Sequence, residues 1–386
     1  TLVLATAAGA LSINVFLPSM PGMAKHFDTD YAVVQLAVSL YLVVTALLQT
    51  VIGPASDRFG RRPVMLACFA VFVVGSLAAI YAPTIELLLA CRLLQASSAG
   101  GMVLSRAAIR DTVDTAEAAS MIGYVTMGMS VVPMIGPMIG GFLDELYGWQ
   151  ATFLLMLSFG IVALAVIYLD FGETNHHRAA SLGEQFRSYP ELLSSRRFWG
   201  YTATAAFTSG AFFAFIGGGP YVASEMLKLS PSQYGFYFGI LSVGYMLGNF
   251  ISGRFSRRIG INRMMFLGNV VAVLGMALAI ALFALGYTHP LSLFGTAFFT
   301  GVGNGITLPN ANAGMVSVRP HLAGSAPGRG GALQTGGGAV LPVAATAVLS
   351  PESGPYPLLW VMLLSSAAAV VATLYVMYVE RQSSEI

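Results

Sequence analysis

The chain has 386 residues, of which 56% are hydrophobic and 9% are charged, and its formal net charge is +2. A soluble domain carries roughly 25% charged residues, so this composition excludes an ordinary water-soluble protein and indicates one that crosses a membrane repeatedly. The small, scattered positive charge offers no basic surface for nucleic acid. The two cysteines, Cys68 and Cys91, lie in apolar segments and form neither a disulfide framework nor a metal-ligand cluster.

Twelve apolar runs have about the 20 residues that a membrane-spanning helix needs. The first is too long for a signal-peptide core, and because Thr1 already lies in it, we expect the natural start upstream. The chain is therefore predicted to be an all-α polytopic membrane protein. The expected helices are 1–24, 32–55, 64–82, 86–108, 116–143, 149–171, 198–221, 232–254, 264–286, 290–313, 329–350 and 356–379.

The positions of arginine and lysine test this number of spans. Only Lys25 and Lys228 fall in loops on one side, and Arg92 lies inside a predicted helix. Basic residues favour cytoplasmic loops, so both termini are expected in the cytoplasm. An odd number of helices would distribute these basic residues over both sides of the membrane. The sixteen cations on the other side are Arg58, Arg61, Arg62, Arg106, Arg110, Arg178, Arg187, Arg196, Arg197, Arg254, Arg257, Arg258, Arg263, Arg319, Arg329 and Arg381.

The longest stretch without an apolar run lies midway along the chain and divides the predicted helices six and six. We expect an N-terminal bundle at 1–171, a cytoplasmic linker at 172–197 and a C-terminal bundle at 198–386. His176 and His177 in the linker lack a third ligand at zinc spacing, so a solvated linker is favoured over a metal site.

A charged turn, G-P-A-S-D-R-F-G-R-R-P-V at 53–64, separates the second and third predicted helices. Much of it returns 200 residues later without a gap, so that Gly60 matches Gly260. The chain is therefore expected to be a duplicated helical unit, an arrangement that places the substrate path between the halves. Only the first copy holds an acid, because Asp57 is matched by Arg257.

Asp57 lies where the second helix is expected to end, and the helix dipole disfavours a carboxylate there. It gains most from a cation or from the N-terminus of another helix, which makes it a candidate latch between helices. The alternative is a solvated loop acid. Arg58, Arg61 and Arg62 suit this helix end, and their side chains can snorkel to lipid headgroups.

Arg92 lies about one and a half turns into the fourth predicted helix. A charge at such depth costs on the order of 3 kcal/mol on insertion scales, so Arg92 is expected to face the bundle interior with a partner or water. Gln95 shares its face of the helix. The alternative is that Arg92 snorkels to the outer surface.

The fifth predicted helix contains a helix-packing motif of small residues and proline. Glycines spaced by four let helices approach closely, and Pro137 removes a backbone hydrogen bond and bends the helix. We expect this motif to form the close-packed seam between the halves. Its members are Gly136, Pro137, Gly140 and Gly141.

The chain has no nucleophile elbow, phosphate loop, metal-binding helix pair or nucleotide-binding domain. We therefore expect neither an enzyme nor a bound cofactor. Deep amides such as Asn310 must pair across helices or line a wet cavity. The aromatic cluster with Phe212 and Phe215 is the usual composition of a core, and a cavity for an apolar ligand is the other interpretation.

Several of these stretches resemble the major facilitator superfamily. Residues 53–64 resemble the signature loop after its second helix, and Arg92 with Gln95 resembles its fourth-helix motif. Residues 136–141 resemble the motif associated with antiporters, although Val132 replaces a glycine usual there. Further stretches resemble the bicyclomycin and chloramphenicol resistance branch of the twelve-helix drug:proton antiporters: 16–21, 110–111, 148–153, 308–311 and 323–326.

This resemblance implies two pseudo-symmetric six-helix bundles that rock about a central pocket. It implies a monomeric exporter of the bacterial inner membrane that exchanges protons for small, often apolar drugs. Asp57 would latch the cytoplasmic side, with Arg61 and Arg62 completing its charge network. One departure is Asn14, which stands where many relatives have an acid.

We place the substrate pocket where methionine and aromatic side chains adapt to varied apolar ligands and a few amides orient them. Its expected members are Asn14, Tyr41, Met129, Phe212, Phe215 and Asn310.

All seventeen acids are expected in loops or near helix ends, and the amide of Asn14 cannot titrate. Proton coupling is therefore expected to use a peripheral acid, Asp57 first and Asp111 second, with the proton gradient as the energy source. The alternatives are a metabolite facilitator of the same fold that is uncoupled or differently coupled, and a non-transporting membrane receptor.

Overall fold

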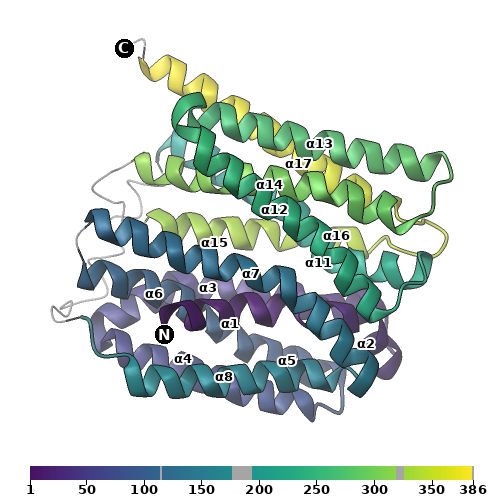
Figure 1. Cartoon of the computed structure of the whole chain (residues 1–386), viewed down its shortest axis with the longest axis horizontal. Helices are drawn as coiled ribbons and strands as arrows, with labels where there is room; N and C mark the ends of the chain where they lie inside the picture. Colours follow the sequence, from purple (N-terminus) through teal and green to yellow (C-terminus); the bar gives the residue numbers. More distant parts are fainter. Residues whose placement is uncertain (114, 176–193, 319–325, 385–386) are drawn as a thin grey trace. The chain divides into compact units, whose positions relative to one another are not determined.

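The computed structural model describes residues 1–113, 115–175, 194–318 and 326–384 (Figure 1). Within these ranges every regular element is a helix. The prediction of an all-α membrane protein is confirmed, because nine helical stretches of the described residues are long and apolar enough to cross a bilayer.

The first six predicted spans all coincide with helices, two of which are broken. The first and fourth spans are interrupted by short 3₁₀ turns, and the first break contains Pro18. The elements are α1 (Leu2–Asn14), η1 (Leu17–Ser19), α2 (Met20–His26), α3 (Tyr31–Phe59), α4 (Arg61–Ile80), α5 (Ile85–Gln95), η2 (Ala96–Ser98), α6 (Ala99–Thr112), α7 (Thr115–Tyr147) and α8 (Gln150–Asp170).

The last six predicted spans coincide with helices as well. The seventh continues into a π-helical turn, and the eleventh is divided after Gly338. The elements are α11 (Arg196–Tyr221), η3 (Val222–Met226), α12 (Pro231–Ile259), α13 (Ile261–Ala284), α14 (Pro290–Ser317), α15 (Ala326–Gly338), α16 (Val340–Thr346) and α17 (Tyr356–Ser384).

The chain forms two compact units. The first comprises Thr1–Arg187 with Ser230–Gly235, and the second comprises Ser188–Leu229 with Phe236–Ile386. Most of the predicted linker 172–197, with its two histidines, lies outside the described residues, so the predicted domain boundaries stay a prediction.

The first unit is held by close contacts between α1 and α7 and between α4 and α8. A buried cluster that includes Met65, Phe69, Leu104 and Ile167 joins α4, α6 and α8. These contacts fix the helix ends that carry the charged residues of the 53–64 turn.

The small residues of the predicted seam all make close helix contacts. A Cβ added at Gly136 would lie 3.5 Å from the Cβ of Asn14, and one at Gly140 would overlap the carbonyl oxygen of Val15. Both contacts are with the C-terminal end of α1 or with Val15 directly after it, inside the first unit. Gly141 faces Pro231, in the short segment that belongs to the same unit. The motif therefore serves close helix packing in the first unit, and its role as a seam between the predicted halves stays a prediction.

The 200-residue repeat is visible in the helix boundaries. α3 ends at Phe59 and α12 at Ile259, and each is followed by a glycine with positive φ, +102° at Gly60 and +88° at Gly260. The next helix begins one residue later in both units. Glycine is required here because L side chains rarely adopt this backbone conformation.

Candidate functional site

Arg92 is fully buried in the interior of the first unit. Its Nε donates to the carbonyl oxygen of Ala37 (3.1 Å), and its Nη1 donates to Ser12 Oγ (3.0 Å) and Gln95 Oε1 (2.5 Å). Its Nη2 donates to the carbonyl oxygen of Ser12 (2.9 Å). This placement excludes snorkelling to the outer surface.

The guanidinium of Arg92 also lies over two aromatic rings. Its carbon is 4.5 Å from the ring centroid of Phe16 and 4.6 Å from that of Tyr41. The hydrogen-bond partners and rings named here carry no formal charge, so carbonyl dipoles and two π faces stabilise the cation. Sequence reasoning missed Ser12 and Phe16, because nothing in their spacing shows that α1 and α5 meet.

A second charged cluster joins the ends of three helices of the first unit. Arg61, at the start of α4, forms an ion pair with Asp57 of α3. Its Nε donates to Asp111 Oδ2 of α6 (2.8 Å), and its Nη1 donates to Ser56 Oγ (2.5 Å). Two carboxylates therefore share one largely buried guanidinium, and Asp57 connects helices as a latch would.

The segment after α8 clips onto this cluster. Glu173 Oε1 accepts from the backbone N–H of Arg61 (2.9 Å) and Oε2 from that of Arg62 (3.3 Å). Asn175 Nδ2 donates to the carbonyl oxygen of Asp57 (2.9 Å). Both helix ends thus find partners for backbone groups that lack intrahelical ones. Sequence reasoning missed both residues of this clip, although an acid just past a helix end was a usable signal.

The Glu173 carboxyl is partly exposed, and its pKa follows from two opposed effects. Burial alone would raise this pKa, but hydrogen bonds from backbone N–H groups, led by those of Asn175 and Arg61, hold it below the ordinary value. The backbone N–H groups at the N-terminal end of α4 therefore stabilise the charged form of Glu173.

Arg62 packs against α8. Its Nη2 donates to the carbonyl oxygen of Tyr168 (2.8 Å), and its guanidinium carbon lies 5.6 Å from the Tyr168 ring centroid. These contacts connect α4 with α8. Asp57 and Asp111 both pair with Arg61, and the part of Arg62 in the charge network of Asp57 stays a prediction.

The second unit has a carboxylate that accepts hydrogen bonds from two other helices and that sequence reasoning missed. Glu380 of α17 accepts from Arg197 Nη2 (2.5 Å) and Tyr201 Oη (2.7 Å) of α11, and from Asn262 Nδ2 of α13. Asn262 stands 200 residues after Arg62, so in both units this position connects the third span to the last. The repeat offset was the signal that could have found it.

The predicted pocket residues of the first unit differ in what surrounds them. Asn14 is buried and its Nδ2 donates to the carbonyl oxygen of Ala10 (2.7 Å), while the Tyr41 hydroxyl is hydrogen-bonded to Ser98 Oγ (2.8 Å). Met129 lies in α7, with its side chain outside the described residues.

In the second unit, Phe215 is fully buried, with ring centroids 6.1 Å from Phe238 and 5.7 Å from Phe294. Phe212 is half-buried. Asn310 Nδ2 donates to Ser252 Oγ (2.9 Å), which is the pairing across helices expected of a deep amide. A substrate pocket made from residues of both units stays a prediction.

The comparisons with known proteins give the family. The family model of the Major Facilitator Superfamily (MFS) matches residues 2–342 and 216–385. The chain therefore belongs to this superfamily of membrane transporters and is a transporter rather than an enzyme.

The relatives agree with the resemblance to the resistance branch. An uncharacterized MFS-type transporter of Bacillus subtilis, YdgK, is 32% identical over 71% of this chain and 70% of its own length. A bicyclomycin resistance protein homolog of Haemophilus influenzae is 27% identical over 95% and 91%. Multidrug resistance protein D of Escherichia coli is 27% identical over 92% and 89%. The prediction of this kinship is confirmed.

Solved structures of other transporters show the same fold. The human organic anion transporter MFSD10 (TETRAN) superposes with a TM-score of 0.73 at 18% identity over 97% of both chains. A bacterial homolog of the human lysosomal transporter Spinster superposes with a TM-score of 0.73 at 15% identity, over 98% of this chain and 95% of its own. At these identities the likeness extends to the fold alone.

Proposed function

We propose that this protein exports small organic molecules, chiefly apolar drugs, across the bacterial inner membrane by alternating access, in exchange for protons. The names of its relatives, which include bicyclomycin, chloramphenicol and multidrug resistance proteins, support the export of such compounds. We propose further that it acts as a monomer with both termini in the cytoplasm, and that it needs no cofactor beyond the proton gradient.

The proposal of proton coupling rests on one observation, which is that Asp57 and Asp111 both pair with the guanidinium of Arg61. Every acid that the structure describes lies between helices or within four residues of a helix end. Among them, these two carboxylates lie on different helices and both pair with Arg61. Protonating one would leave Arg61 paired with the other alone. Such a change of partners at the ends of α3, α4 and α6 is how a proton would bias one conformation over another.

We propose that substrate binds among Asn14, Tyr41, Met129, Phe212, Phe215 and Asn310. One feature of the first unit supports a polar contact there. Asn14 Oδ1 is buried and accepts no hydrogen bond from the described residues, and an acceptor left in this way favours a ligand that brings a donor. Tyr41 and Phe215 would have to exchange their present contacts for substrate.

Transport in proteoliposomes with an imposed pH gradient tests the coupling. We expect the unmutated protein to accumulate drug against its gradient, and Asp57→Asn and Asp111→Asn each to lower this accumulation at least tenfold while downhill flux remains. Glu86→Gln, an exposed acid at the start of α5, is the matched control and should transport normally. Accumulation that survives both aspartate substitutions would refute coupling through these acids.

An uncoupled facilitator is the second candidate function. It is favoured by the lack of any acid deep within a span of the described residues, since a coupled exporter needs a group that changes its protonation. The same vesicles separate the two functions. Downhill flux in the unmutated protein without any accumulation driven by the pH gradient would indicate a facilitator. A drug-susceptibility panel in an efflux-deficient host would then give no protection.

A further inference from the structure

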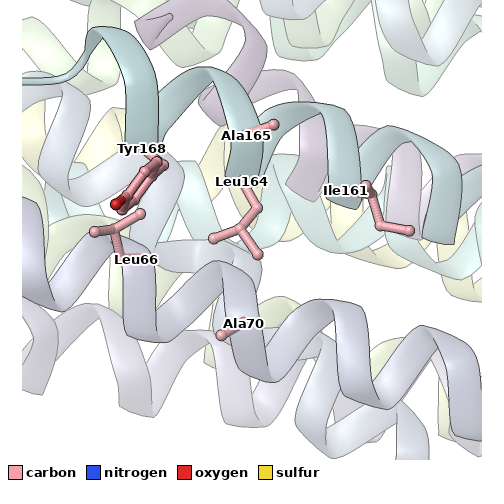
Figure 2. A pocket seen from close by; sticks show the side chains of 6 residues that line it. All are labelled: Leu66, Ala70, Ile161, Leu164, Ala165 and Tyr168. Atoms are coloured by element: carbon pink, nitrogen blue, oxygen red, sulfur yellow. The ribbon is translucent and has the colours of Figure 1, made fainter.

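An apolar groove lies on the exposed surface of the first unit between α4 and α8 (Figure 2). Its volume is about 480 Å³. Both helices are among the candidate membrane spans, so the surroundings of the groove are lipid chains rather than water. Figure 2 shows the two helices contributing facing side chains, which are Leu66 and Ala70 of α4 and Ile161, Leu164, Ala165 and Tyr168 of α8.

The shape of the groove follows from residue size along the two helices. Ala70 and Ala165 are small and leave the hollow, whereas a Cβ added at Gly160 would lie only 2.8 Å from the ring of Phe72. The two helices therefore approach each other closely just past the end of the groove that is farther from Arg62. From Ala70 to Arg62 is ~12 Å along α4, against ~15 Å for half of a bilayer's hydrocarbon core. The distance from Ala70 to Arg62 is thus close to the depth of one lipid leaflet.

Arg62 lies at the other end of this groove, where α4 begins and α8 ends. Arg62, Leu66 and Ala70 are spaced by four and share one face of α4. The guanidinium is held over the Tyr168 ring by its hydrogen bond to the Tyr168 carbonyl oxygen. Its Nε is buried and has no hydrogen-bond partner among the described residues. A cation in contact with Tyr168, which lines the groove, therefore lies where the headgroup of a lipid in the groove would be.

The acids near this end are already engaged. Glu173 accepts from the first backbone N–H groups of α4, and Asp170 accepts from the Thr1 hydroxyl. An anion at this end would therefore be held by the Arg62 side chain, since the helix N-terminus is occupied. A guanidinium fork binds phosphate oxygens through charge-assisted hydrogen bonds.

We propose that this groove binds an anionic phospholipid, with one acyl chain between α4 and α8 and its phosphate on Arg62. An anionic lipid is favoured over a zwitterionic one because the latter brings its own cation to compete with Arg62 for the phosphate. The bound lipid ties α4 to α8 next to the Glu173 clip. The site is independent of the proposed export, so either can fail without the other.

Native mass spectrometry of the delipidated protein tests the site, with dioleoyl phosphatidylglycerol or dioleoyl phosphatidylcholine added in detergent. We expect severalfold more phosphatidylglycerol than phosphatidylcholine to be retained. Arg62→Gln should abolish this preference, and Ala70→Phe should reduce the retention of both lipids severalfold. Arg58→Gln and Ala67→Phe are the matched controls, because both residues are exposed and neither lines the groove.

Thermal unfolding of the same samples gives a second measurement. Phosphatidylglycerol should raise the midpoint of the unmutated protein more than that of Arg62→Gln. Equal retention of the two lipids by the unmutated protein, or equal losses in Arg62→Gln and Arg58→Gln, would overturn the headgroup site. Equal retention by Ala70→Phe and Ala67→Phe would overturn the groove as the place of the chain.

Discussion

Arg92 illustrates how a full charge is accommodated inside a helical bundle without a carboxylate among the partners seen here. Four hydrogen bonds, from three different nitrogens, go to Ala37, Ser12 and Gln95, and the guanidinium carbon lies over two aromatic rings. Only a planar fork can meet these requirements together. A compact ammonium group has three donors and no flat face.

We therefore expect Arg92→Lys to destabilise the protein although the charge is kept. Losing at least one charge-assisted hydrogen bond costs about 1.5–3 kcal/mol. The midpoint of thermal unfolding in detergent should fall by several degrees, whereas exposed Arg58→Lys should leave it unchanged. A midpoint of Arg92→Lys equal to that of the unmutated protein would show that charge alone is needed here.

Glu173 supplies a pH dependence whose sign follows from its lowered pKa. Because the pKa of Glu173 is lower in the folded than in the unfolded protein, the stabilisation from its charged form is fully present above the unfolded value of about 4.5. This stabilisation is lost as the pH falls through the pKa that Glu173 has in the folded protein. Glu173→Gln should thus be less stable than the unmutated protein at pH 7, and the difference should shrink below pH ~4.

Thermal midpoints between pH 3 and pH 7 measure this difference. Glu352→Gln, in an exposed loop, is the control and should show little difference from the unmutated protein at any pH. A stability gap between Glu173→Gln and the unmutated protein that stays constant down to pH 3 would mean that the charge of Glu173 is not what the helix end holds.

At the scale of elements, the two copies of the glycine turn make a natural comparison. Gly60 and Gly260 have similar positive φ angles, but a Cβ at Gly60 would overlap the Glu173 carboxylate and one at Gly260 would meet nothing within 4 Å. The backbone strain is therefore shared, and the contact with the clip belongs to the first unit alone.

Replacing each glycine by alanine should separate these effects. Both variants should lose about 1–3 kcal/mol from the strained backbone, and Gly60→Ala should lose more because Glu173 is displaced from α4. Gly53→Ala, inside α3 with nothing within 4 Å of its Cβ, should be neutral or stabilising. Chemical or thermal unfolding of the three variants provides the measurement, and equal losses at Gly60 and Gly260 would contradict a role for the clip.

At the scale of the whole molecule, the two units share their helix order and differ in chemistry at equivalent positions. Phe69 lies in the apolar core of the first unit. Its counterpart 200 residues on, Asn269, is buried and bonds Thr208, Thr307 and Thr373 on three other helices. These four polar groups satisfy one another, which lets the second unit bury them inside a membrane fold.

The proposed orientation of the whole chain can be tested on one helix. Lys228 precedes α12 and Arg254 lies near its other end. Single cysteines at these two positions, in a background without Cys68 and Cys91, should react with a membrane-impermeant reagent from opposite sides, Lys228→Cys from outside intact cells. Labelling of both from the same side would refute the predicted topology.

The sequence by itself determined that this is a helical membrane protein with a duplicated unit, because long apolar runs and a gapless offset are properties of the chain that folding does not alter. It also marked Arg92, Asp57 and Arg61, since charge at a helix end or inside a span is costly wherever the neighbours lie. Only the tertiary structure decided the partners. That Ser12 meets Arg92, that Glu173 clips the start of α4, and that Gly140 packs at the end of α1 depend on which helix faces turn toward each other. Distant contacts of this kind leave no periodic trace in a single sequence.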